Sequence, residues 1–129
     1  MTALRLLSVA VGGALGAVTR YVVSHAVAVA TRSLFPWGTL VVNAAGCFLI
    51  GVLMVGSTRL VRHPEAQVLL VTGFVGALTT FSTFSLETVI LIEREVYWQA
   101  AANVVVSLVV GIVFVLAGGA LARYVARIG

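Results

Sequence analysis

The sequence predicts an all-α integral membrane protein that crosses the bilayer with four helices. Of its 129 residues, 61% are hydrophobic and only 9% are charged, whereas soluble domains carry about 25% charged residues. The mean hydropathy is +1.17, and the charged residues are separated by long apolar runs. This composition excludes a soluble enzyme, a nucleic-acid-binding domain and a disordered chain.

Four apolar stretches are long enough to cross a bilayer, whose hydrocarbon core needs about 20 residues per helix. The predicted spans cover residues 4–30, 37–58, 66–92 and 96–122. They leave only short loops, so residues 1–129 are interpreted as a single four-helix subunit. We therefore expect its function to lie within the membrane.

The loop charges favour one orientation. The chain has eight arginines and no lysine. With four spans, the two ends and the second loop share one side of the membrane. That side carries five arginines, and the other side carries two, Arg32 and Arg94. Because cytoplasmic loops are enriched in cations, the bias predicts cytoplasmic termini. The five are Arg5, Arg59, Arg62, Arg123 and Arg127.

The first span combines glycines with a charge. Gly12, Gly16 and Arg20 are spaced four residues apart and share one helix face. Glycines at this spacing let membrane helices approach closely, which favours a packing role. A charge within a span is costly unless it faces water, a partner or an anion. Two interpretations of Arg20 stay open: a place at the mouth of a polar passage, which is favoured, or a side chain that snorkels to the lipid headgroups.

The second and fourth spans each carry a polar stripe. Thr39 and Asn43 share one face of the second span, and Asn103 and Ser107 share one face of the fourth, with Gly111 next in register. The amide of Asn43 has two open interpretations: an interhelical hydrogen bond, which is common in membranes, or a donor that lines a polar path.

The third span is unusually polar. Residues 72–88 read TGFVGALTTFSTFSLET, in which glycines precede a dense run of hydroxyls. Such residues are poor helix formers, and their side chains can satisfy backbone groups freed by a helix break. A discontinuity is predicted within residues 75–80. Phe81 and Phe84 follow on one face, and Glu87 is the one acid within a predicted span.

The polar residues on three spans favour a passage through the membrane over a catalytic site. The sequence has no carboxylate pair, histidine cluster or nucleophile–base arrangement, so an enzyme is not expected.

Three runs carry a family resemblance: GGALGAVTRY (12–21), WGTLVVNAAGCFLIG (37–51) and GFVGALTTFSTFS (73–85). Together they resemble the Fluc/CrcB family of bacterial fluoride channels.

The resemblance implies an architecture. The third helix would be broken near the membrane centre, and two subunits would form an antiparallel dimer with two fluoride pores in the bacterial inner membrane. The second subunit would be another copy of the chain or a paired homologue. Passive fluoride export would protect the cytoplasm from fluoride toxicity.

The resemblance also implies roles for individual residues. Phe81 and Phe84 would lie beside the permeating fluoride, and Arg20 would lie near an aqueous vestibule. The hydrogen-bonding groups of the pore would come from Asn43, Ser82, Thr83 and Ser107.

Three further positions carry implied roles. Backbone carbonyls of Gly76 and Thr79, from both subunits, would hold a structural Na⁺ at the dimer centre. Glu87 matches an acidic position at the outer end of the third-helix segment. Asn103 departs from the pattern, since some family members carry an aromatic hydroxyl there.

Two other classes of protein compete with a channel. A small multidrug-type proton-coupled antiporter also has four helices, but its mechanism needs a carboxylate central to the first span, where this chain has Arg20 and no acid. A non-transporting assembly subunit would not need polar stripes on three spans. Selective fluoride flux separates the channel from both.

Overall fold

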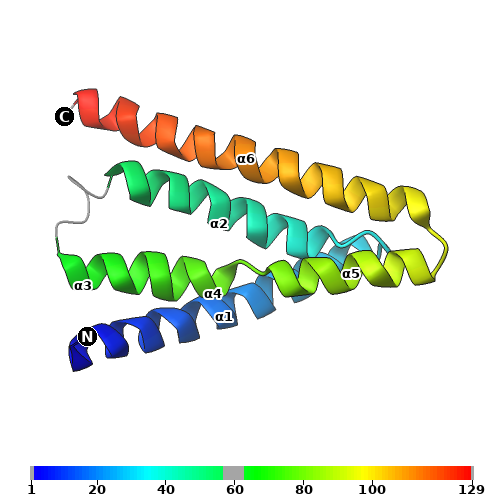
Figure 1. The fold of residues 1–129 in the computed structure, drawn as a ribbon, viewed down its shortest axis with the longest axis horizontal. Helices are drawn as coiled ribbons and strands as arrows, with labels where there is room; N and C mark the ends of the chain where they lie inside the picture. The colour runs from blue at the N-terminus through cyan, green and yellow to red at the C-terminus, as the bar shows by residue number, and fades with distance from the viewer. Residues whose placement is uncertain (1, 57–62, 129) are drawn as a thin grey trace.

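The structure, a computed structural model, describes residues 2–56 and 63–128, except for the side chains of residues 55 and 56. Within these residues, four helical stretches are long and apolar enough to cross a membrane (Figure 1). Arg59 and Arg62, on which the predicted orientation partly depends, and the last two residues of the predicted second span lie outside the described residues.

The first two spans and the last are each one helix. The third comprises several segments in sequence. The elements are α1 (Ala3–Thr31), α2 (Trp37–Gly56), α3 (Pro64–Gln67), the π-helix η1 (Val68–Val75), α4 (Gly76–Leu78), α5 (Phe81–Glu93) and α6 (Tyr97–Ile128).

The helix α6 continues six residues beyond the predicted span, through Arg123 and Arg127. Arginine is a good helix former, and cations near a helix C-terminus interact favourably with its dipole. A helix can therefore run past the point at which its sequence stops being apolar.

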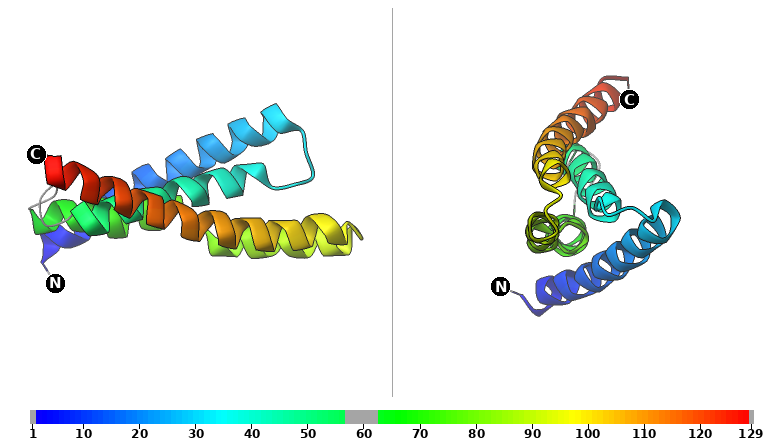
Figure 2. Two further views of the ribbon diagram at one scale, coloured as in Figure 1. Left: turned by 90° about the horizontal axis from the view of Figure 1, so that it is seen from above. Right: turned by 90° about the vertical axis from the view of Figure 1, so that its right-hand side faces the viewer.

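The helices form an open arrangement around α2. Figure 1 shows α2 between α6 and the segments of the third span, with both described chain ends at the same end of the molecule. The end-on view in Figure 2 shows α1 crossing on the far side from α6. The most extensive contacts join α2 to α6 and α1 to η1.

Glycines allow α1 to cross η1 with its backbone in contact. A Cβ at Gly12 would collide with the Leu69 carbonyl, and one at Gly16 with the Phe74 carbonyl. Gly73 of η1 faces Gly12 in the same crossing. This confirms the packing interpretation of the first-span glycines.

The contact between α2 and α6 is built in the same way. A Cβ at Gly51 would meet the Val115 carbonyl, and one at Gly118 would meet the Phe48 carbonyl. These glycines therefore let the backbones of α2 and α6 lie in direct contact along one side of α2. The rest of α2 faces α1 and the segments of the third span.

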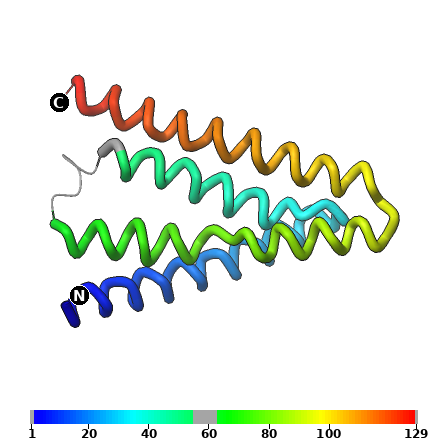
Figure 3. The backbone as a smooth tube through the Cα atoms, viewed as in Figure 1, coloured from blue at the N-terminus to red at the C-terminus, as the bar shows by residue number. Residues whose placement is uncertain are grey.

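Two extended residues separate α4 from α5. Thr79 has φ −82° and ψ 154°, and Thr80 has φ −150° and ψ 116°. Figure 3 follows the backbone through this stretch, where the coil opens between two helical segments. Preceding it, η1 is wound as a π-helix over eight residues, a form that is rare and often found at functional sites.

Candidate functional site

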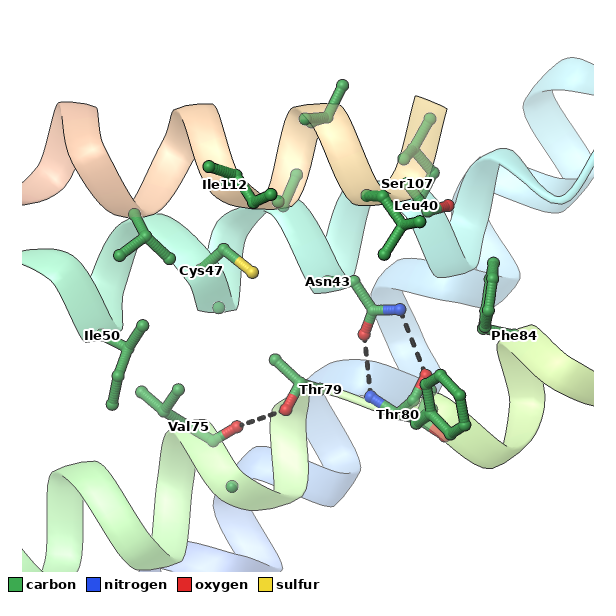
Figure 4. A pocket seen from close by; sticks show the side chains of 18 of the residues that line it. Leu40, Asn43, Cys47, Ile50, Val75, Thr79, Thr80, Phe84, Ser107 and Ile112 are labelled. Atoms are coloured by element: carbon green, nitrogen blue, oxygen red, sulfur yellow. Dashed lines mark hydrogen bonds between the residues drawn. The ribbon is translucent and has the colours of Figure 1, made fainter. Parts of the chain in front are cut away.

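An open groove of about 670 Å³ runs between α2, α6 and the segments on either side of Thr79 and Thr80. Its walls are mainly aliphatic, with Leu40, Ile50 and Ile112 among them (Figure 4). A few polar side chains interrupt this surface at one place along its length. They are Asn43, Thr79, Thr80 and Ser107.

The carboxamide of Asn43 binds the backbone of Thr80 at two points. Its Oδ1 accepts from the Thr80 N–H at 2.8 Å, and its Nδ2 donates to the Thr80 carbonyl at 3.1 Å (Figure 4). The interhelical interpretation of Asn43 is thus confirmed. Because a carboxamide has two N–H groups, one donor is left beyond this pair of bonds, so the donor interpretation is compatible with the same geometry.

The hydroxyls around Thr80 form a compact cluster. The Thr80 hydroxyl donates to Thr83 Oγ1 at 3.0 Å and accepts from the Thr83 N–H at 3.2 Å. It also lies 3.3 Å from the Ser82 hydroxyl. Thr80 is thereby the N-cap of α5. Ser82 and Thr83 are exposed and lie outside the set of residues that line the groove.

Phe81 and Phe84 stand together at the edge of the groove. Their ring centroids are 5.5 Å apart, with the planes tilted by 41°. Phe81 is 78% exposed, whereas Phe84 is half-buried and lies near Thr80 in Figure 4. Ring edges carry partial positive charge, so this pair can offer weakly electropositive C–H groups to a small anion.

In a continuous helix, the carbonyls of Gly76 and Thr79 would each accept a hydrogen bond from the amide four residues further along. The extended residues remove both of these bonds. The amide four residues beyond Gly76 belongs to Thr80 and donates to Asn43. The amide four residues beyond Thr79 belongs to Thr83 and donates to the Thr80 hydroxyl. Gly76 is exposed, and a Cβ there would meet only the Val71 carbonyl, at 3.7 Å. Carbonyl oxygens are ligands that hard cations prefer.

Glu87 lies at a second, smaller pocket of about 210 Å³, with Thr39 and Arg94. The Thr39 hydroxyl donates to Glu87 Oε1 at 2.8 Å. Glu87 Oε2 is buried without a hydrogen-bond partner among the described residues. The sequence showed both residues but not their contact, since they are on different helices. Arg20 is half-buried on α1 and lines neither this pocket nor the groove.

Asn103 is almost completely enclosed, with 1% of its surface exposed. Its Nδ2 donates to the Thr88 hydroxyl at 2.9 Å, and its Oδ1 accepts from the Ser107 hydroxyl at 3.4 Å. The stripe predicted from Asn103 and Ser107 is thus a bonded pair. Thr88, its partner on α5, belongs to the hydroxyl run seen in the sequence but was given no role there, because the spacing within one helix does not reveal a contact with another.

Four membrane-length helices within the described residues, and an apolar groove with a few polar side chains, define a small multi-pass membrane protein. Comparison with known sequences shows which family of membrane proteins the chain belongs to. Residues 7–119 match the family described as "CrcB-like protein, Camphor Resistance (CrcB)", and the chain belongs to this family.

Three similar proteins carry the same name. The chain is 44% identical to "Fluoride-specific ion channel FluC" of Salinibacter ruber over 94% of this chain and 91% of the relative. It is 44% identical to the protein of that name from Hahella chejuensis, over 97% and 99% of the two chains. The protein of that name from a Shewanella species is 47% identical, over 80% and 83%.

Proposed function

We propose that this protein is a subunit of a fluoride-selective channel that lets cytoplasmic fluoride leave the cell down its gradient. One observation carries the proposal beyond the names of the relatives. Asn43, with one amide N–H left over from its bonds to Thr80, lines the same groove as Phe81, Phe84 and the Ser107 hydroxyl, which supports the proposal. These groups suit a small anion and leave no fixed positive charge beside it.

The proposed mechanism is stepwise replacement of hydration. Fluoride enters along donors from Asn43, Ser107 and the hydroxyls of Ser82 and Thr83, while the edges of Phe81 and Phe84 supply weak positive charge. Conduction requires binding that is strong enough to admit the ion and weak enough to release it. Neutral donors and ring edges meet this requirement better than lysine side chains, which the sequence lacks.

A second subunit would complete the pore. The groove is open along one side, and Phe81 projects from its edge with 78% of its surface exposed. We propose that another copy of the chain, or a paired homologue, packs antiparallel over this face. The resulting dimer would enclose two pores, and the interruption at Thr79 and Thr80 would lie near the membrane centre.

The carbonyls of Gly76 and Thr79 are the proposed ligands of a structural Na⁺ at the dimer centre. Their fit rests on the amides that donate elsewhere and on the open surface beside Gly76. Two subunits would supply four oxygens. Bound there, the ion would neutralise the clustered carbonyl dipoles and hold the two interrupted segments together.

Two charged residues have proposed places outside the groove. Arg20 would face an aqueous vestibule, where its charge attracts anions. Glu87 would mark the outer end of the third-span segment. The bacterial inner membrane is the proposed location, with both chain ends in the cytoplasm for a subunit that follows the arginine bias. The proton-coupled antiporter is not favoured, because α1 carries no carboxylate.

Fluoride efflux from liposomes that contain the purified protein tests this function. We expect rapid fluoride release, measured with a fluoride electrode, and little chloride release from matched vesicles. Protein-free liposomes control for leakage of HF. Loss of both anions at similar rates, or no fluoride flux from an intact dimer, would contradict the proposed function.

A further inference from the structure

Three hydrogen bonds form a directed chain from α6 into α5. The Ser107 hydroxyl donates to Asn103 Oδ1 at 3.4 Å, and Asn103 Nδ2 donates to Thr88 Oγ1 at 2.9 Å. The Thr88 hydroxyl in turn donates to the Phe84 carbonyl at 2.8 Å. The chain begins at one groove-lining residue and ends at the backbone of another.

The middle of this chain has little freedom to rearrange. Asn103 is 1% exposed, and Thr88 is half-buried. Removing one partner from a buried hydrogen bond leaves the other unsatisfied, which costs more than the bond itself contributes. The Asn103–Thr88 bond therefore fixes where α5 lies against α6.

The position of Phe84 follows from its neighbours on α5. Thr80, Phe84 and Thr88 are spaced four residues apart, so they follow one another along one side of α5 and its N-cap. Thr80 is fastened to α2 through Asn43, and Thr88 is fastened to α6 through Asn103. Phe84 thus lies midway between two residues that are each hydrogen-bonded to a different helix, Thr80 to α2 and Thr88 to α6.

We infer that Asn103 is a positioning residue, which holds the Phe84 ring at the groove by anchoring Thr88 while it orients the Ser107 hydroxyl. The inference rests on the proposed function, in which Phe84 and Ser107 meet the anion. Asn103 itself lies outside the groove-lining set and acts through its two partners. At 3.4 Å the Ser107 bond is long, so the hydroxyl can turn toward an arriving anion at small cost.

Two substitutions test the anchor in reconstituted liposomes. Thr88→Val keeps the side-chain shape and removes the hydroxyl, and Asn103→Leu removes the amide. Each is expected to lower fluoride flux about tenfold, because one buried hydrogen bond corresponds to roughly one factor of ten. The double variant is expected to lose no more than Asn103→Leu alone, which already breaks both hydrogen bonds of the Asn103 side chain. Thr88→Ser, which keeps the hydroxyl, is expected to restore flux to within about twofold of the starting protein.

Thr31→Val is the matched control. Thr31 makes the same back-bond as Thr88, from its hydroxyl to the Val27 carbonyl at 2.9 Å, but at the exposed end of α1. Its flux is expected to be unchanged. In a Phe84→Ile background, Thr88→Val is expected to have no further effect, since the ring that it positions is gone. A tenfold loss in that background would reveal a merely structural role and overturn the inference.

A spectroscopic measurement separates this inference from the proposed function. Fluorine NMR of a fluorophenylalanine at position 84 reports the ring environment in detergent whether or not the protein conducts. We expect one narrow line in the otherwise unchanged protein and in Thr31→Val, and a shifted or broadened line in Thr88→Val. An unchanged line in Thr88→Val would overturn the inference. Absent fluoride flux in the unsubstituted protein would overturn the channel proposal instead.

Discussion

The side chain of Asn43 occupies both hydrogen-bonding positions of the Thr80 backbone, at 2.8 Å to its N–H and 3.1 Å to its carbonyl. An amide side chain thus replaces the helical partners that Thr80 lacks in its extended conformation. In a bilayer, backbone groups without partners cost several kcal/mol each. One residue of α2 therefore decides whether the chain can be extended at position 80.

Asn43→Leu should be the most damaging single change to the groove. It leaves the N–H and carbonyl of Thr80 without partners, and we expect a loss of about 2–4 kcal/mol of stability together with loss of fluoride flux. Asn43→Asp keeps the acceptor and loses the donor, so its stability should be intermediate. Thermal unfolding in detergent measures this order. Equal stability of Asn43→Leu and the unsubstituted protein would contradict this role of Asn43.

Two adjacent glycines of α1 should respond differently to the same substitution. Gly12→Ala places a methyl group against the Leu69 carbonyl, whereas Gly13→Ala meets nothing within 4 Å. We expect Gly12→Ala to lower stability by about 1–3 kcal/mol, as overpacking does, and Gly13→Ala to leave it nearly unchanged. Melting temperatures of the two purified variants provide the comparison. Similar melting temperatures would rule out the close crossing of α1 and η1.

Replacing either phenylalanine should separate conduction from folding. Phe81→Ile and Phe84→Ile keep apolar bulk and remove the electropositive ring edge. We expect fluoride flux to fall by about tenfold or more in each, the equivalent of roughly 1.4 kcal/mol, while size-exclusion profiles stay unchanged. Liposome efflux measures the effect. Undiminished flux in both variants would eliminate the ring-edge mechanism without affecting the fold.

The contact between Thr39 and Glu87 should contribute measurably to stability. Thr39 is 5% exposed, and its hydroxyl donates to Glu87 Oε1 at 2.8 Å. Thr39→Val removes this donor, and we expect a loss of about 1–3 kcal/mol. Thr39→Ser, which keeps the hydroxyl, serves as the control and should retain most of the stability. Chemical or thermal unfolding of the pair in detergent would show no difference if the contact contributes nothing.

Removal of Na⁺ should weaken the proposed dimer. If carbonyls of Gly76 and Thr79 from two subunits hold the ion, exchange of Na⁺ for a large organic cation leaves those oxygens without a ligand. We expect lower fluoride flux and a larger monomer fraction, measured by efflux and by light scattering in detergent. Readdition of Na⁺ should restore both. A dimer and flux indifferent to the cation would contradict the sodium site.

The sequence predicted an all-helical chain with four membrane-length stretches, because hydropathy and charge determine where such helices can lie. The expected first span, 4–30, differs by one residue at each end from α1, Ala3–Thr31. The π-helical winding of η1 could not be predicted in this way. Within η1, Gly73 lies against Gly12 across the α1 crossing, and a contact between two helices is invisible to a pattern within one helix.

In the candidate site, too, patterns within one helix could be predicted and contacts between helices could not. Stripes within one helix, such as Asn103 with Ser107, were visible from spacing. Partners on separate helices were not: Thr88 for Asn103, Glu87 for Thr39 and Thr80 for Asn43. Spacing also gave no sign that Arg20 lies away from the groove. Such contacts depend on helix packing, which one sequence does not specify.

The hydrogen bonds of Thr80 have a consequence for biogenesis. An interruption that is fastened by another helix has no partners until that helix is beside it. Before residues 64–93 pack against α2, they therefore gain nothing from opening at Thr79 and Thr80, since a continuous helix satisfies its own backbone in lipid. The extended conformation at Thr79 and Thr80 is thus acquired during assembly of the helix bundle. A misplaced α2 would therefore also distort the proposed pore.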